Sequence, residues 1–235
     1  MAETTASSPA SAPVVVEQRN ERGDLAARTE LVNGVPHGVT TSYGATGKPA
    51  MEASYRAGVL HGGSRVWADD GQLVQEAQYQ QGKQHGVARI YAGGKLLVQQ
   101  TFALGLQHGE TIMYAENGDP SCKLQFKQGQ IEGEALFFNE GALVRRATYR
   151  KGLIEGEAID YDREGSKIQS AHYKANILDG WLRRYWPNGQ VMEEVQYQKG
   201  KPVGKPRRFN IKGARQAGDA AQASLMQRLE KLVRG

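Results

Sequence analysis

The sequence is poor in residues and motifs that would indicate cross-linking, membrane insertion or catalysis. Cys122 is the single cysteine among 235 residues, which excludes an internal disulfide and a zinc site built from cysteines. No run reaches the roughly 18 apolar residues that a transmembrane helix needs. There is no Gly-x-Ser-x-Gly, His-Glu-x-x-His, Gly-x4-Gly-Lys-Ser/Thr or dinucleotide-binding pattern. We therefore expect no enzyme, no catalytic residues, no bound metal and no cofactor.

Charge is unevenly distributed along the chain, although its formal net value is only +5. Residues 1–141 hold 11 Lys+Arg and 15 Asp+Glu, which gives −4, whereas residues 142–235 hold 19 and 10, which gives +9. A basic C-terminal half permits an acidic partner without identifying one. Because basic residues alternate with acidic ones and no nucleic-acid-binding motif is present, we do not expect nucleic-acid binding.

Glycine is abundant, with 29 residues in the chain, and it recurs at a fixed period. A first glycine returns in steps of 23 or 24 residues, with asparagine in one place: Gly34, Gly58, Gly82, Gly105, Gly129, Gly152, Asn176 and Gly200. A second glycine follows four residues later, an aromatic residue five after that, then a turn glycine and another aromatic. These columns define seven complete units and the beginning of an eighth.

Each unit is expected to be a β-hairpin. Turn sequences such as Asp-Asp-Gly (69–71) and Pro-Asn-Gly (187–189) supply the positive φ that a tight turn needs. In the second strand, small or apolar residues alternate with polar ones, as in Ala53 beside Ser54, so we expect one buried and one wet face. Stacked hairpins share a core that a lone hairpin lacks. The predicted fold class is all-β, an elongated open twisted antiparallel sheet of stacked ~24-residue hairpin repeats with a short C-terminal helix cap.

Three segments are predicted. Residues 1–13 are small, polar and proline-punctuated, and are expected to be disordered. Residues 14–209 form the repeat domain, in which Val14–Leu31 supplies a capping strand. Residues 210–235 form a tail with an amphipathic helix at about 219–234, whose apolar residues recur at helical spacing. This helix is expected to cover the last hairpin, with a partner-binding or membrane-surface role as the alternative.

The repeat frame resembles the bacterial variant of the MORN repeat, as found in YwqK-type antitoxins. The resemblance is carried by G-x-x-x-G-x-x-x-x-aromatic and the following Asn-Gly or Asp-Gly turn, and it covers about residues 31–209. The best unit runs from Asn176 to Tyr197 and contains Gly180-Trp181 and Tyr185-Trp186-Pro187-Asn188-Gly189. The resemblance implies an open twisted sheet of hairpins that neutralises a toxin by binding it or mediates other protein contacts.

Histidine occupies one repeat position, directly before the second glycine: His37, His61, His85 and His108. Later units hold Glu132, Glu155 and Asp179 there. Equivalent positions in adjacent hairpins lie roughly 9–10 Å apart, whereas each ligand of a zinc ion lies ~2.1 Å from it. We therefore expect a structural or surface role between hairpins, with partner contact and metal binding as the lesser alternatives.

The first strand of each unit carries the candidate partner-binding residues. The positions three and four after the second glycine are apolar in the fourth and fifth units and include arginine on either side. Such an apolar centre is either covered by the chain itself or exposed as a protein interface. Trp186 stands where most units have a small residue, and is expected to anchor a cap or a partner. The candidates are Arg65, Arg89, Ile112, Met113, Leu136, Phe137, Arg183 and Trp186.

The expected function is that of a non-enzymatic antitoxin or immunity protein that occludes a protein partner, such as a toxin or secreted effector. The alternative is a membrane-surface or scaffold protein that attaches through its basic C-terminal half and tail helix. The small polar N-terminal segment is typical of exported proteins, which suggests a bacterial periplasmic location although no signal segment is recognised in residues 1–235; a cytoplasmic location is the alternative. Open end strands would also permit a dimer.

Overall fold

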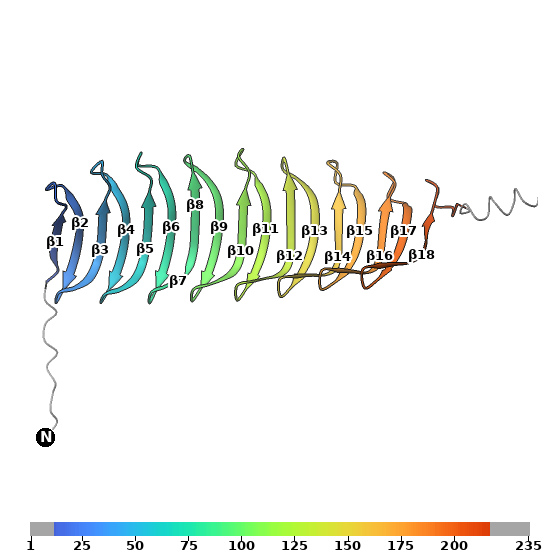
Figure 1. Cartoon of the computed structure of the whole chain (residues 1–235). Coiled ribbons are helices and arrows are strands. Elements are labelled where there is room, and N and C mark those ends of the chain that lie inside the picture. The colour runs from blue at the N-terminus through green and yellow to red at the C-terminus, as the bar shows by residue number, and fades with distance from the viewer. Residues whose placement is uncertain (1–11, 217–235) are drawn as a thin grey trace, which may run out of the picture. The chain divides into compact units, whose positions relative to one another are not determined.

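The computed structural model describes residues 12–216, which form antiparallel β-strands joined by tight turns (Figure 1). Within that range there is no helix, and thus none that is long and apolar enough to cross a membrane. The chain divides into two compact units, Met1–Gly118 and Asp119–Gly235, called unit 1 and unit 2 below. The predicted all-β architecture of antiparallel hairpin repeats is confirmed. The predicted helix at 219–234 and residues 1–11 of the segment 1–13 predicted to be disordered lie outside the described residues.

Unit 1 holds ten strands, and consecutive strands pair antiparallel except for the seventh with the eighth. The sixth strand pairs with both the seventh and the eighth, because these two are parts of one strand interrupted at His85. The strands are β1 Val14–Arg19, β2 Leu25–Val32, β3 Val35–Tyr43, β4 Pro49–Arg56, β5 Val59–Trp67, β6 Leu73–Gln80, β7 Lys83–Gln84, β8 Gly86–Ala92, β9 Lys95–Ala103 and β10 Leu106–Tyr114.

Unit 2 holds eight strands with the same antiparallel order. They are β11 Pro120–Lys127, β12 Gln130–Asn139, β13 Ala142–Arg150, β14 Leu153–Tyr161, β15 Lys167–Lys174, β16 Ile177–Tyr185, β17 Val191–Gln198 and β18 Lys201–Arg208. The predicted capping strand at Val14–Leu31 in unit 1 needs a correction, because the chain there forms two strands, β1 and β2, which pair as a hairpin of their own. The turn glycine Gly23, with a φ of 87°, makes this extra hairpin possible.

The first glycine of each repeat lies in a two-residue turn between consecutive hairpins. In each such turn both residues have positive φ, the geometry of a type I′ turn, which follows the twist of the strands it joins. Asn176 takes the glycine place with a φ of 67°, so the prediction that asparagine substitutes there is confirmed. The residues before the glycine are also left-handed, with φ between 48° and 53°: Asn33, Ala57, Gln81, Leu104, Gln128, Lys151, Ala175 and Lys199.

The shortened repeats have a direct structural cause. In a 24-residue unit the turn within the hairpin is longer, as at Ala68–Gln72, where the Gly71 amide donates to the Ala68 carbonyl at 2.8 Å. In the two 23-residue units this turn contains only two residues, Gly93-Gly94 or Glu140-Gly141, which both have positive φ. One deleted residue thus exchanges one turn type for another and leaves the strand register intact.

In each unit a row of small residues runs across the strands on one face, called the small-residue face of that unit. In unit 1 the register pairs Ala53 with Ser64, and Ser64 with Ala77. In unit 2 the row contains Ala135, Ala147, Ala158 and Ala171 at successive strands. All these residues are buried, whereas polar neighbours such as Gln78 and Thr148 are exposed, so the predicted alternation is confirmed at these positions of the second strands. The opposite face of unit 2 is not solvated throughout, because Ile159 and Ser170 are buried there.

Larger apolar residues gather on the small-residue face of unit 2. Cys122, Leu124 and Ala135 are buried together. They contact the partly buried Phe126, Ile131, Phe137 and Tyr149. Burial raises the pKa of the Cys122 thiol, because the thiolate would lose hydration there. This cluster is therefore a hydrophobic reinforcement of the sheet, and its cysteine is kept in the unreactive thiol form.

The turn geometry predicts a stabilising substitution at Leu104, which has a φ of 51° and a side chain that is largely exposed. Leu104→Asn should raise the free energy of unfolding by roughly 0.5–1 kcal/mol, because asparagine adopts the left-handed conformation with less strain. Leu104→Ala removes the same exposed side chain but keeps that strain, so it should give no such gain. Urea unfolding of the three proteins measures the difference, and equal stability of the two variants would contradict the explanation.

Candidate protein-binding face

The face opposite the small-residue row is called the arginine face, and its central row in unit 1 alternates in charge. The register places Glu52 beside Arg65, Arg65 beside Glu76, and Glu76 beside Arg89. Two of the predicted candidates, Arg65 and Arg89, therefore lie in one cross-strand row with two carboxylates. Opposite charges on neighbouring strands stabilise the pairing, so these arginines support the sheet as well as facing solvent.

Arg89 is held by several short polar contacts. Its Nη1 lies 2.7 Å from Oε1 of Glu76, and its Nε donates to Oε1 of Gln99 at 2.9 Å. The Tyr91 hydroxyl donates to the same Glu76 oxygen at 2.9 Å. The hydrogen bond from Arg89 lowers the pKa of Glu76 and the same bond raises the pKa of Arg89, while burial and the bond to Glu76 raise the pKa of Tyr91. Arg89 is thus committed to an internal network.

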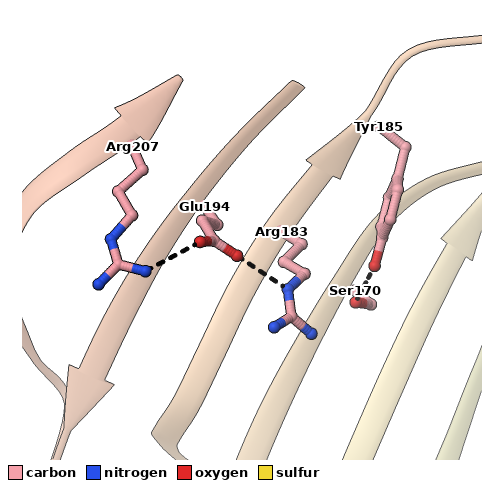
Figure 2. A network of polar contacts seen from close by, with 5 residues as sticks. All are labelled: Ser170, Arg183, Tyr185, Glu194 and Arg207. Carbon is pink, nitrogen blue, oxygen red and sulfur yellow. Dashed lines mark hydrogen bonds and ion pairs between the residues drawn. The ribbon is translucent and has the colours of Figure 1, made fainter. Parts of the chain in front are cut away.

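The arginine face of unit 2 carries a second cluster around Trp181, on β16, β17 and β18. Arg183 Nε donates to Oε2 of Glu194 at 3.2 Å, and Arg207 Nη1 donates to Oε1 of the same carboxylate at 3.3 Å (Figure 2). The Cζ atoms of Arg183 and Arg207 lie 5.4 Å and 5.1 Å from the centre of the Trp181 ring. Both guanidinium groups therefore lie within cation–π distance of one indole ring.

A shallow open pocket of about 290 Å³ adjoins this cluster. Its lining includes Glu157, Ser170, His172, Trp181 and Arg183. Ser170 is buried and its hydroxyl lies 2.9 Å from the Tyr185 hydroxyl (Figure 2). The pocket is open to solvent and presents an aromatic ring, one guanidinium and one carboxylate side by side.

His172 and Gly180 show why glycine is needed at the second glycine position beside this pocket. Gly180 has a φ of 132°, and a Cβ there would lie 2.8 Å from the Cβ of His172. The imidazole therefore lies directly over the glycine backbone of the next strand. A side chain at residue 180 would displace His172 and with it one wall of the pocket.

The structure separates the predicted candidates and does not gather them into one patch. Arg65, Arg89 and Ile112 lie on the arginine face of unit 1, and Leu136 and Arg183 on that of unit 2. Met113 and Phe137 alternate with these residues and point to the small-residue face, where Phe137 is part of the buried cluster. Leu136 is half-buried, and Ile159, which lies two strands further along the same row beyond Arg146, is buried.

Trp186 lies in the turn between β16 and β17. Its Nε1 donates to the Phe209 carbonyl at 3.1 Å, and its backbone amide donates to Gln190 at 2.8 Å. The indole thus joins this turn to the segment that follows β18. Trp186 therefore stabilises the end of the described repeat array.

Sequence reasoning left Trp181, Glu194 and Arg207 out of the candidate set. Trp181 was visible only as a member of a repeat column whose other members are as varied as Val39, Gly63 and Lys205. The signal that could have found them is the register, because Arg183 and Arg207 lie on the strands that flank Glu194. When the residues that face one another on neighbouring strands are compared, Arg183, Glu194 and Arg207 are seen to be adjacent.

The side chain directly before the second glycine accepts a hydrogen bond from a backbone amide in the following inter-hairpin turn, about 20 residues later. Glu132 Oε2 accepts the Lys151 amide at 2.8 Å, and Glu155 Oε2 accepts the Ala175 amide at 2.9 Å. Nδ1 of His37 and of His61 faces the equivalent amides of Ala57 and Gln81 at 3.4 and 3.5 Å. The column therefore caps the left-handed turn residue, a structural role. Residues 12–216 contain no group of three potential metal ligands.

Comparison with known proteins identifies the repeat. Residues 178–199 match the family model described as MORN repeat variant. The matched segment covers most of β16, the following turn and β17, and thus contains Trp181, Arg183 and Glu194. No curated protein matches the chain. One hairpin of the array is thus similar to a MORN repeat variant, and the neighbouring hairpins share its positional frame.

The Glu76 network predicts a pH-dependent contribution to stability. Because the pKa of Glu76 is lowered in the folded protein, its contribution is complete above the unfolded value of about 4.3 and is lost as pH falls through the lower folded value. Glu76→Gln should therefore cost about 1 kcal/mol at neutral pH and progressively less in acid. Urea unfolding across pH measures this, with Glu110→Gln as the control because Glu110 forms no ion pair among the described residues. A cost that is independent of pH would refute the assignment.

The turn-capping column predicts a second loss of stability. Glu132→Ala should lower the free energy of unfolding by about 1 kcal/mol, because the Lys151 amide loses its acceptor. Glu132→Gln keeps an acceptor oxygen and should retain most of the stability. Glu134→Ala is a matched control two residues away, where the exposed carboxylate forms only a surface ion pair with Arg146. If the Glu132 and Glu134 variants lose the same stability, the capping role is wrong.

Proposed function

We propose that this chain is a non-enzymatic protein-binding repeat protein of the antitoxin or immunity type, which neutralises a toxin or secreted effector by covering it. The observation that carries the proposal is the Trp181 cluster, where an indole and two partly exposed arginines lie on the surface of three neighbouring strands. Tryptophan and arginine are the residue types most enriched among those that dominate binding energy.

The form of the surface also supports binding over catalysis. The described pocket is shallow and open, and its residues are linked to structural neighbours rather than arranged as nucleophile, base and oxyanion donors. A broad face that carries a few strong contacts can block the active cleft of a partner without chemistry of its own. An exported, periplasmic location would bring such a protein to a secreted effector.

The partner that fits the Trp181 cluster carries carboxylates. Arg183 and Arg207 share one carboxylate, that of Glu194, so the three side chains carry a formal charge of +1. The adjoining strand β18 adds Lys201 and Lys205. An acidic partner surface would meet complementary charge here and would associate faster at low salt.

The test is protection from a toxic protein encoded beside the gene for this chain, measured by growth on co-expression and by complex formation between the purified proteins. Trp181→Ala and Arg207→Ala should each weaken the complex by about 2 kcal/mol, roughly 30-fold in Kd, and reduce protection. Arg208→Ala is the matched control: it removes the next arginine of β18, which pairs with Glu193 on the small-residue face. Equal effects of the two arginine variants would contradict this face as the binding surface.

The proposal predicts that the chain does not depend on binding to anionic lipid for its function. Salt-sensitive sedimentation with anionic vesicles that is abolished by deleting residues 219–235, together with no protection by the full chain, would overturn the antitoxin proposal. It would instead favour attachment to a membrane surface through the C-terminal tail.

A further inference from the structure

The first strand of unit 1 has an edge that no described strand occupies. The register pairs β1 with β2 alone, and Figure 1 shows β1 at the end of the strand series of unit 1. All six of its residues are exposed. An edge strand directs the N–H and C=O groups of every second residue outward, which makes it a template for a further strand.

The edge protection of β1 is confined to its C-terminal end, where Glu17 and Arg19 are charged and the register shifts between Gln18 and Arg19. Its sequence, VVVEQR, contains no proline, glycine or lysine, and its register with β2 is unbroken from Val14 to Gln18. The side chains of Val14, Val15 and Val16 are exposed by 61%, 43% and 38%. Exposed valines on a regular edge favour strand addition, because they lose contact with water as the ladder extends.

β18, the last strand of unit 2, has these protective features. Its sequence, KPVGKPRR, includes Pro202 and Pro206, which have no N–H to donate, and Gly204. Its four basic residues give it a formal charge of +4, which opposes the approach of a like strand. The contrast indicates that the outer edge of β1 can accept a further strand, whereas the prolines and positive charge of β18 oppose one.

The charges of β1 suit a second copy of the same strand. Glu17 and Arg19 lie 3.5 Å apart on one side of the strand and cancel in formal charge. In an antiparallel pair centred on Val16, Val14 faces Gln18 of the second copy and Val15 faces Glu17 of the second copy, so no like charges are opposed. Each pair has both side chains on one face, as an antiparallel sheet requires.

We propose that β1 is a self-association edge, and that two copies of this chain pair β1 to β1, antiparallel and centred on Val16. The pairing is isologous, so a single two-fold axis closes the assembly as a dimer and leaves no free copy of the same edge. It extends the backbone ladder and places Val16 of one copy opposite Val16 of the other. This inference does not depend on the proposed antitoxin function.

The test uses sedimentation equilibrium of the full chain from micromolar to millimolar concentration. The wild-type protein should dimerise reversibly. Val16→Lys should raise the dimer Kd by about tenfold or more, because it replaces a central apolar pair with two like charges. Val203→Lys, an exposed valine of β18, should leave the dimer unchanged. Circular dichroism confirms that each variant is folded.

A charge-swap pair makes the test specific to this register. Val16→Glu alone should also weaken the dimer, whereas an equimolar mixture of the Val16→Lys and Val16→Glu chains should restore it as a heterodimer. A wild-type chain that is monomeric throughout, a Val16→Lys chain that still dimerises, or a mixture that is not restored would overturn the proposal. A monomer whose β1 amides are nevertheless protected from hydrogen exchange would indicate that another segment occupies the edge, which overturns it equally.

Discussion

The left-handed backbone of the inter-hairpin turns is the constraint on which the rest of the structure depends. Each type I′ turn reverses the chain in two residues, and this fixes which residues of adjacent strands face one another. The cost of holding Ala57 or Lys151 at positive φ is offset by local contacts, because the residue before the second glycine accepts the turn amide. Val35 shows a further contact of this kind: its Cγ1 lies so close to Gly58 that a Cβ there would be 2.9 Å away. The turn residue, the glycine and the side chain that accepts the turn amide therefore stabilise the same turn together.

A single-layer sheet of this kind buries few side chains completely, and this limits how its faces can recognise a partner. The residues that reach full burial are mostly small, such as Ala135 and Ala147, because side chains of the same layer shield them rather than a second layer. Larger groups remain partly exposed in cross-strand rows, spaced by about 4.8 Å per strand. Recognition by such a surface depends on which residues occupy a row. The central row of the arginine face is an alternating charge ladder in unit 1, whereas in unit 2 it includes the apolar Leu136 and the buried Ile159.

The sequence was sufficient to predict the hairpins, the turn glycines and the alternation of faces, because each of these follows from a period that glycine marks directly. It predicted the place of Asn176 for the same reason. It did not predict the extra β1–β2 hairpin, whose turn at Gly23 lies outside the repeat frame. The candidate site was less predictable, since Met113 and Arg183 were selected by position along a strand although alternation puts them on different faces. Which strands lie beside a residue depends on register, and register becomes visible only when the turns are counted residue by residue.

The two arginine clusters differ in how many of their donors are already used, and this decides which of them suits a partner. A guanidinium has five N–H donors. Arg89 directs two of its nitrogens at Glu76 and Gln99, and Tyr91 takes part in the same network, so a partner would have to compete with short internal bonds. Arg183 and Arg207 each give one longer hydrogen bond to Glu194, and Trp181 aligns both groups without using any of their N–H donors. A carboxylate arriving at Trp181 can therefore accept hydrogen bonds from positioned guanidiniums while Glu194 stays in place, which lowers the cost of binding there relative to Arg89.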